Sequence, residues 1–471
     1  MSRVELAVIG GGPAGMAAAV AAAERGVRVT LVDENPQLGG QYWRQPPATF
    51  HATHSSRDAA QGRALMERVR ALGVDLRLDT VVWGLFDGKT LALARGQLVD
   101  RLDADAIVFA LGAYDRPVPF PGWTLPGVVT AGGAQNLMKG YGVLPGRRVL
   151  VAGSGPLLLV VAQYLLAGGA QVVAVAEAAS MRSPWRWGVR LLAYPEFLGQ
   201  GLGYMAKLRR AGVPFLRGHV IREAIGEAEV TGAVVGACDD AWFPVSGTER
   251  RFEVDAVVVG HGFVPSSDLP RLADCEYRWI PDVGGWVPVL GEAQASTVPG
   301  VFIAGEAAGV AGAVVALEEG RLAGLGAARY LKRLSETRFR TLAGAVERRL
   351  RRLAGFRRVM DELYRPGPGL GALADAGTVV CRCEELRAAT IQAAIDDGAR
   401  LVNEVKTYTR AGMGRCQGRL CGPPVAAMIA RTTGGSPADA GAFTARVPVK
   451  PVSFAALAGT AAGGRGEEDM R

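Results

Sequence analysis

The same series of segments occurs twice along the chain: an apolar run, a glycine-rich turn, a helix-like stretch and a second apolar run. The first copy has an apolar run at residues 4–9, glycines at 10–15, a helix-like stretch at 16–24 and a second apolar run at 27–32. Short apolar runs rich in β-branched residues are typical of strands buried on both faces of a parallel sheet. The pattern therefore predicts a strand, a glycine turn, a helix and a second strand.

The second copy lies at residues 148–177 and predicts a strand at 148–152, a helix that ends near residue 167 and a strand at 171–176. Glycines divide this apolar stretch, so it predicts no membrane-spanning helix. Strand-like segments that end in glycine at 106–112 and 256–262 would lead into and out of the second unit. We therefore expect an α/β fold with two nested Rossmann-like dinucleotide-binding domains. The outer domain comprises residues 1–117 and 286–370, and the inserted domain comprises residues 118–285.

The glycines of the first turn have separate roles in binding a dinucleotide. Gly10 permits the tight turn, Gly12 lets the backbone approach a pyrophosphate, and Gly15 lets the helix pack against the strand. The helix N-terminus then faces the phosphate charge. Asp33 ends the second strand, where a carboxylate can bind the ribose hydroxyls. The expected phosphate-binding turn comprises Gly10, Gly12, Pro13, Ala14 and Gly15.

The inserted unit carries a poorer version of this turn. Gly153 and Gly155 match the first two glycines, but Leu158 replaces the third. Glu177 at the end of the next strand would favour a ribose with a free 2′-hydroxyl, as in NAD, over the 2′-phosphate of NADP. Three interpretations stay open: a working NAD(H) site, an adenine nucleotide bound without hydride transfer, and an empty structural remnant.

Four of the six cysteines lie close together in the sequence, as a C-x-C pair and a later C-x4-C pair. Four thiolates from two loops suit one zinc ion or one [2Fe–2S] cluster. Neither pair has the C-x2-C spacing usual for structural zinc, and glycines around the second pair allow backbone N–H groups to approach sulfur, which favours the cluster. The expected metal ligands are Cys381, Cys383, Cys416 and Cys421.

Length and composition restrict the remaining classes of function. A chain of 471 residues with 49% hydrophobic and 21% charged residues is a folded protein of about three domain-sized units. The net charge of +8 comes mostly from arginines spread along the chain, so no nucleic-acid partner is expected. The N-terminal residues do not read as a signal peptide, which points to the cytoplasm. No redox-active cysteine pair follows the first glycine turn, which excludes disulfide-reductase chemistry.

Further segments resemble parts of two-dinucleotide-domain flavoproteins. Residues 297–306 are similar to their second flavin motif, in which the terminal acid binds the ribityl chain of FAD. The family has Asp at the last position, so the Glu here reaches one methylene further. The resemblance implies that the helix at 312–331 points its N-terminus at the flavin. A glycine pair soon after Asp33 lets more backbone reach the pyrophosphate. The expected FAD contacts outside the first turn are Gly40, Gln41, Gly112, Gly305 and Glu306.

The cysteine motifs at 381–385 and 412–421 look like the [2Fe–2S] domain of bacterioferritin-associated ferredoxin, and this resemblance implies a small α-helical domain at 371–432. Residues 433–471 would form an extended strap and, from residue 460, a disordered tail. The whole arrangement resembles the α subunits of opine oxidase, D-hydroxyproline dehydrogenase and hydrogen cyanide synthase complexes. It is also similar to part of those of dye-linked L-proline dehydrogenase and heterotetrameric sarcosine oxidase.

This resemblance implies an FAD and [2Fe–2S] subunit of a heteromeric dehydrogenase that oxidises the C–N bond of a secondary amine or amino acid and passes electrons to an acceptor such as a quinone. It implies a flavin-containing β subunit similar to glycine or sarcosine oxidase, a small ferredoxin-like γ subunit, FMN at a subunit interface, and peripheral contact with the inner membrane through the complex. Two alternatives stay open, a self-sufficient NADH-dependent reductase and a mainly structural assembly subunit. The sequence assigns no catalytic residue.

Overall fold

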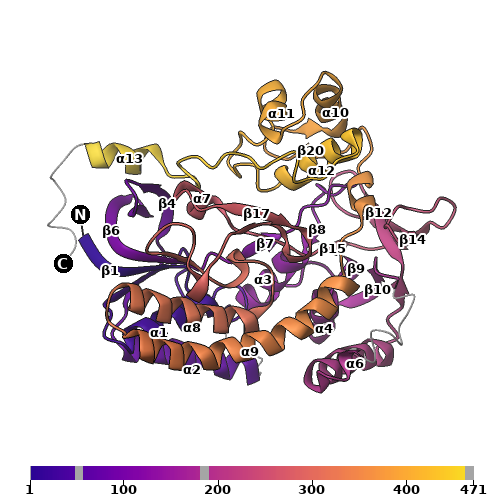
Figure 1. Ribbon diagram of the computed structural model, residues 1–471. Helices are drawn as coiled ribbons and strands as arrows, with labels where there is room; N and C mark the ends of the chain where they lie inside the picture. The colour runs from indigo at the N-terminus through magenta and orange to yellow at the C-terminus, as the bar shows by residue number, and fades with distance from the viewer. Residues whose placement is uncertain (1, 48–56, 181–189, 462–471) are drawn as a thin grey trace.

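The computed structural model describes residues 2–47, 57–180 and 190–461 (Figure 1). The outer domain is built on a sheet with the strand order β3-β2-β1-β6-β5-β4, and β19 also pairs with β6. The strands around β1 are parallel, whereas β4 and β5 extend the sheet as an antiparallel meander. The strands are β1 (Ser2–Ile9), β2 (Val29–Val32), β3 (Asp75–Arg77), β4 (Val81–Phe86), β5 (Thr90–Arg95), β6 (Leu98–Phe109) and β19 (Val301–Ile303).

Four helices form a layer on one face of this sheet (Figure 1). They are α1 (Pro13–Ala23), α2 (Arg57–Ala71), α8 (Ala313–Tyr330) and α9 (Glu336–Leu363). Small residues let α1 and α8 approach closely, because a Cβ at Gly320 would lie 2.1 Å from the carbonyl oxygen of Ala14 and one at Gly324 would lie 2.3 Å from that of Ala18. This contact fixes the N-terminal turns of α1 and α8 near each other.

The inserted domain contains a five-stranded parallel sheet with the order β11-β10-β9-β15-β8. Its strands are β8 (Val128–Thr130), β9 (Arg148–Gly153), β10 (Gln171–Glu177), β11 (Phe215–Arg217) and β15 (Ala256–Gly260). Its helices are α3 (Ala131–Tyr141), α4 (Leu157–Ala167) and α6 (Pro195–Arg210), and a second, antiparallel sheet holds β12 (His219–Ile225), β13 (Gly232–Ala237) and β14 (Arg250–Glu253). A mixed sheet with parallel central strands in the outer domain, and a parallel sheet in the domain inserted into it, confirm the predicted nested α/β fold.

The segments that lead into and out of the inserted domain lie side by side. They form β7 (Ala113–Asp115) and β16 (Phe263–Pro265), which pair antiparallel with Ala113 opposite Pro265. After them come α7 (Asp268–Leu272) and a hairpin of β17 (Tyr277–Ile280) and β18 (Gly285–Pro288). The two domains are therefore joined by a double connection, and we call β7 and β16 the connector strands.

The C-terminal domain packs as a separate helical unit beside the connectors (Figure 1). It contains β20 (Val379–Cys381), β21 (Leu386–Arg387), α10 (Ala388–Asp396), α11 (Val402–Thr409) and α12 (Gly422–Thr433) around a buried apolar core. Its helical character confirms the expectation from the cysteine motifs. The indole N–H of Trp123 donates a 2.6 Å hydrogen bond to the carbonyl of Val379 and so ties this domain to the inserted one.

The segment after the helical domain crosses back to the outer domain. There the amide of Val449 donates a 2.8 Å hydrogen bond to the carbonyl of Trp83 on β4. The predicted strap is not extended throughout, because the short helix α13 (Phe454–Ala461) ends the described part of the chain. The predicted disordered tail begins within this helix, and residues 462–471 lie outside the described residues.

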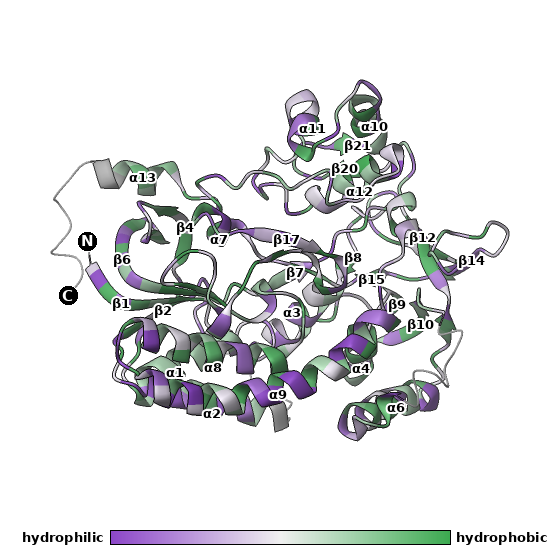
Figure 2. Cartoon of the chain, in the orientation of Figure 1, coloured by the Kyte–Doolittle hydropathy of each residue, from purple (hydrophilic) through white to green (hydrophobic). Residues whose placement is uncertain are grey.

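Hydropathy follows the layers, with apolar residues concentrated in the strands and hydrophilic residues frequent along α9 (Figure 2). Among the described helices, none combines the length and the apolar character that crossing a bilayer requires.

Candidate functional site

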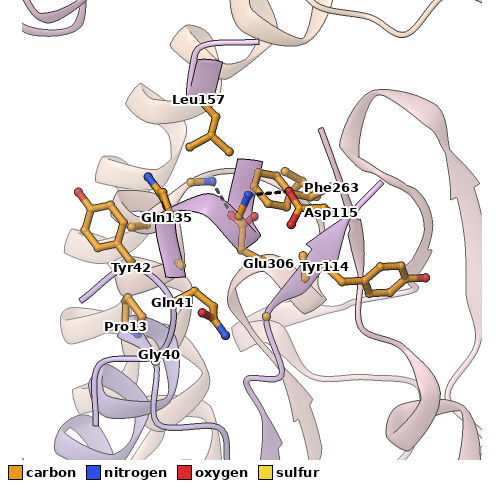
Figure 3. Close-up of a pocket in the computed structure, with 18 of the residues that line it drawn as sticks. Pro13, Gly40, Gln41, Tyr42, Tyr114, Asp115, Gln135, Leu157, Phe263 and Glu306 are labelled. Carbon is orange, nitrogen blue, oxygen red and sulfur yellow. Dashed lines mark hydrogen bonds between the residues drawn. The ribbon is translucent and has the colours of Figure 1, made fainter. Parts of the chain in front are cut away.

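A cleft of about 1860 Å³ lies beyond the ends of β1 and β2 in the outer domain and of β9 and β15 in the inserted domain. Figure 3 shows some of the side chains that line it. The outer domain contributes the first glycine turn, and the inserted domain contributes the turn before α4. In parallel α/β sheets, ligands bind in the crevice beyond the carboxyl ends of the strands. The cleft is lined by ten of the predicted cofactor-binding residues, Gly10, Gly12, Pro13, Ala14, Asp33, Gly40, Gln41, Gly112, Gly155 and Glu306. Four others, Gly15, Gly153, Glu177 and Gly305, lie behind its wall.

The first glycine turn has no room for side chains at two positions. A Cβ at Gly10, whose φ is +107°, would lie 2.3 Å from the carbonyl oxygen of Ala110, and one at Gly15 would lie 1.8 Å from that of Gly10. Gly15 therefore serves close packing, as the sequence predicts. A Cβ at Gly40 would lie 2.8 Å from the Cα of Gly12, so two backbone loops meet at the cleft. No side chain caps the start of α1 in the described residues, which leaves its first N–H groups able to bind an anion.

Asp33 both lines the cleft and holds the glycine turn in place. Its buried carboxylate accepts hydrogen bonds from the backbone amides of Gly11 and Asn35. The residue predicted to bind a ribose thus also positions the turn that faces a pyrophosphate.

A pair of carboxyl groups lies at the start of α8. Glu306 accepts hydrogen bonds from the amides of Ala311 at 3.0 Å and Gly312 at 2.6 Å, and its burial raises its pKa. These two amides directly precede the first turn of α8, whose own first amides have no side-chain cap among the described residues. Glu319, on α8 itself, accepts a 3.0 Å hydrogen bond from the amide of Gly305, and burial raises its pKa to about 8.

The sequence does not single out Glu319, because nothing in its local pattern differs from an ordinary helical Glu. Its role follows from the fold, which brings α8 under the turn at Gly305 and places Arg357 of α9 near the two acids. The Arg357 charge opposes the effect of burial on the pKa of Glu319, and burial prevails.

The corresponding acid of the inserted domain is turned inward. Glu177 is 3% exposed, does not line the cleft, and accepts 3.0 Å hydrogen bonds from the amides of Gly155 and Ala179. Burial raises its pKa. Leu158, which replaces the third glycine, is buried in the domain core. A carboxylate thus holds the inserted turn through backbone amides, as in the first turn, but this carboxylate, Glu177, does not line the cleft.

The fold brings the four clustered cysteines together as two pairs. Cys381 at the end of β20 and Cys421 at the start of α12 are in hydrogen-bond contact, and so are Cys383 and Cys416. The Cys421 thiol, together with backbone amides that include that of Gly412, lowers the pKa of Cys381 to about 5. Cys416 and Cys421 also interact electrostatically, so the two pairs are adjacent.

The glycines around the second pair allow close contacts with other side chains. A Cβ at Gly414 would lie 2.2 Å from that of Cys383, and one at Gly418 would lie 2.3 Å from the Phe443 ring. Within the described residues, no group of three or more His, Cys, Asp or Glu side chains converges on one metal-ion position. The four thiols thus lie as two neighbouring pairs.

Arg419 connects the cysteine loop with the cleft. It lies between Cys416 and Cys421, lines the cleft, and donates hydrogen bonds to the carboxylate of Asp268 at 2.9 Å and to the carbonyl of Val449 at 2.7 Å. Tyr114 of β7 lies within electrostatic range of both Arg419 and Cys416, and burial raises its pKa. These residues carry no recognisable sequence motif, and local sequence patterns do not identify them.

Comparison with known proteins agrees with these features. Residues 4–320 match the pyridine nucleotide-disulphide oxidoreductase family, and residues 377–461 match the sarcosine oxidase A3 domain. The chain is 37% identical to an opine oxidase subunit of Agrobacterium tumefaciens (strain Ach5) over 96% of this chain and 91% of that one. It is 33% identical to hydrogen cyanide synthase subunit HcnB of Pseudomonas aeruginosa over 96% of this chain and 97% of that one.

A solved structure with the same fold extends the comparison beyond sequence. L-proline dehydrogenase from P. horikoshii superposes with a TM-score of 0.70 at 22% identity, covering 97% of this chain and 80% of that chain. The two proteins thus share an overall fold across nearly all of this chain. The chain therefore belongs to the pyridine nucleotide-disulphide oxidoreductase family, as an FAD-dependent oxidoreductase of the group that includes these opine oxidase subunits.

Proposed function

We propose that this protein is the electron-carrying α subunit of a heteromeric dehydrogenase that oxidises the C–N bond of a secondary amine or amino acid. The observation that carries the proposal is the continuity of the cleft, which runs from the first glycine turn to Arg419 in the loop that holds two of the clustered cysteines. One cavity thus extends from the expected FAD site to a residue of the cysteine loop, although none of the four cysteines lines it.

The outer domain fits FAD. The uncapped start of α1 can receive the pyrophosphate, Asp33 lies where the adenosine ribose would bind, and the backbone loops at Gly12 and Gly40 meet without side chains between them. The residues that would hold the dinucleotide are Gly10, Gly12, Pro13, Ala14, Asp33, Gly40, Gln41, Gly112 and Glu306.

The cysteine pairs fit a [2Fe–2S] cluster better than zinc. A single tetrahedral ion needs all four thiolates around one point, whereas a diiron cluster takes two thiolates on each iron. The contacts Cys381–Cys421 and Cys383–Cys416 form two such pairs, and the surrounding amides suit an anionic centre. When bound, FAD accepts an electron pair and the cluster carries single electrons onward.

Residues of the chain would position the FAD and the cluster relative to each other. Glu306 and Glu319 supply two buried carboxyl groups at the flavin end, where Glu319 can retain a proton near neutral pH. Arg419 fixes the cysteine loop against α7 through Asp268.

The substrate would be oxidised by a partner. The relatives are named as subunits of opine oxidase, hydrogen cyanide synthase and sarcosine oxidase, which supports partner subunits for this chain. The partners we propose are a flavin-containing β subunit, a small γ subunit, interfacial FMN and an acceptor such as a quinone. We assign no NAD to the inserted domain, because Glu177 is not among the residues that line the cleft. A cytoplasmic complex, peripheral to the inner membrane, fits this proposal.

Anaerobic purification of the isolated chain tests the proposal. We expect bound FAD, two irons and two labile sulfides per chain, and negligible oxidation of opines, hydroxyproline or proline until the β subunit is added. Rapid bleaching of the flavin by NADH would instead support the self-sufficient reductase. Colourless protein that contains zinc and no labile sulfide would refute the electron-carrying role and favour an assembly subunit.

A further inference from the structure

Two arginines share one carboxylate where α7 meets the loop of the second cysteine pair. Asp268, the first residue of α7, accepts a 2.9 Å hydrogen bond from Nε of Arg419, and its carboxylate also lies 2.7 Å from Nη2 of that side chain. Arg271, on the same helix, lies within electrostatic range of Asp268, although no carboxylate of the described residues forms an ion pair with it. Two positive charges and one negative charge leave this group, which we call the α7 junction, with a net positive charge.

Arg271 is fixed in the α7 junction by contacts that leave its charge in place. Its guanidinium carbon lies 4.2 Å from the ring centre of Tyr277, and its Nε donates a 3.3 Å hydrogen bond to the hydroxyl of Ser267. Its buried Nη2 atom has no hydrogen-bond partner among the described residues. Burial lowers the pKa of Arg271, and the Asp268 charge opposes this effect. Since a guanidinium stays charged in proteins, Arg271 adds a positive charge that water screens only in part.

The α7 junction lies directly against the cysteine loop. Nη1 of Arg419 donates a 3.3 Å hydrogen bond to the backbone carbonyl of Cys416. Tyr114 of β7 lies within electrostatic range of the Asp268–Arg419 ion pair and of Cys416. Burial raises the pKa of Tyr114, which indicates that little water enters the space that these groups share. Charges in such a space act on one another more strongly than charges at the surface do.

The other charged side chains near the cysteines add less net charge. Glu384 and Lys406 are partly buried and have opposite charges, so their effects on a nearby centre oppose each other. Solvent and salt screen the charges of the exposed side chains strongly. These exposed side chains are Arg382, Arg410 and Arg415.

A net positive group beside the cysteines should favour the reduced form of a bound centre. A [2Fe–2S] centre on four thiolates is anionic and gains one more negative charge on reduction, and nearby charge contributes to its potential. We propose that the α7 junction sets the reduction potential of the centre held by the clustered cysteines, with Arg419 and Arg271 raising this potential and Asp268 lowering it. The inference rests on the function proposed above and adds to it three side chains that act by charge and are not ligands.

An anaerobic redox titration of the full-length holoprotein, followed by the electron paramagnetic resonance signal of the reduced centre, tests the proposal. R419Q should lower the midpoint potential and D268N should raise it, each by about ten-fold in the equilibrium constant for reduction, which is about 59 mV for one electron. R271Q should lower the potential by a smaller amount, because Arg271 does not contact the cysteine loop. R419K keeps the charge, and the control D397N removes an exposed carboxylate at the end of α10, so both should stay within about two-fold of the wild type.

The signs of the shifts separate an effect of charge from a structural one. R419Q and D268N break the same ion pair, so a loosened cysteine loop would move the potential in the same direction in both variants, and that result would overturn the proposal. Unchanged potentials in both variants would also overturn it, while the function proposed above would stand. A wild-type protein without a reducible iron–sulfur centre would refute that function and this inference together. If R419Q does not retain the centre, R271Q and D268N give the same comparison of signs.

Discussion

Single atoms decide whether the first glycine turn can form. The Cβ of an alanine at position 15 would lie 1.8 Å from the carbonyl oxygen of Gly10, so α1 would have to move away from β1. That movement disrupts both the packing of the helix and the position of its N-terminal amides. The binding of the dinucleotide and the stability of the outer domain therefore depend on the same missing methyl group.

Gly15→Ala should lower the free energy of unfolding by about 2–3 kcal/mol and abolish the retention of FAD, since overpacking of a dense contact carries a cost of this order. Chemical denaturation and the flavin absorbance of purified protein measure the two effects. The matched control is Gly201→Ala on α6, where the added Cβ meets nothing within 4 Å. It should be neutral or stabilising by up to about 1 kcal/mol. Normal FAD content in Gly15→Ala would show that the turn adapts.

Glu319 makes stability depend on pH. Its folded-state pKa of about 8 lies above that of the unfolded chain, so the folded state keeps a proton that the unfolded state loses. The free energy of unfolding should therefore fall as the pH rises from about 5 to 8, relative to Glu319→Gln, and then become parallel to it. Denaturant titrations across this range measure the difference. Glu227→Gln, at an exposed position, should follow the wild type, and a pH-independent difference for Glu319→Gln would contradict the assignment.

At the level of elements, the sequence predicts the units with local signals and misses the contacts between them. The predicted strand–turn–helix units match β1, α1, β2, β9, α4 and β10 within a few residues, because apolar runs and glycines report burial and turns directly. Arg419 and Asp268 are 151 residues apart in the sequence and meet only in the folded chain. Their pairing could not be read from either local pattern.

If the cysteine loop docks against α7, the effects of substituting Arg419 and Asp268 on the free energy of unfolding should be coupled. Their side chains are 22% and 24% exposed, so the ion pair is partly shielded from solvent. We expect a double-mutant cycle of Arg419→Gln and Asp268→Asn to give a coupling of about 1–2 kcal/mol. The equilibrium unfolding of the four proteins measures it. Additive effects of the two substitutions would show that the contact does not hold the loop.

Over the whole molecule, the two expected cofactor sites belong to separate cores. The glycine turn packs into the core of the outer domain, and the cysteines pack into that of the helical domain. The sequence predicts this division well, since each site has its own compact motif. It does not predict that the cleft beside the glycine turn extends to Arg419 of the cysteine loop, because that depends on the relative placement of three domains.

Loss of one centre should therefore spare the other. Cys383→Ser should remove at least nine-tenths of the iron and labile sulfide while FAD stays bound in stoichiometric amount. Gly15→Ala should remove FAD and leave the iron content unchanged. Metal analysis and absorbance spectra of both variants provide the readout, with Cys238→Ser as the control for a thiol outside the cluster. Joint loss of both centres in either variant would contradict independent sites.

The antiparallel pairing of β7 with β16 has an engineering consequence. Ala113 faces Pro265 across the ladder, and paired residues in such strands are about 5 Å apart at their Cα atoms. A two-residue hairpin could thus replace everything in between and yield a minimal flavin module. Such an excision would also delete Trp123, whose indole donates a hydrogen bond to the carbonyl of Val379 on β20. The shortened protein would therefore lose one contact that holds its C-terminal helical domain.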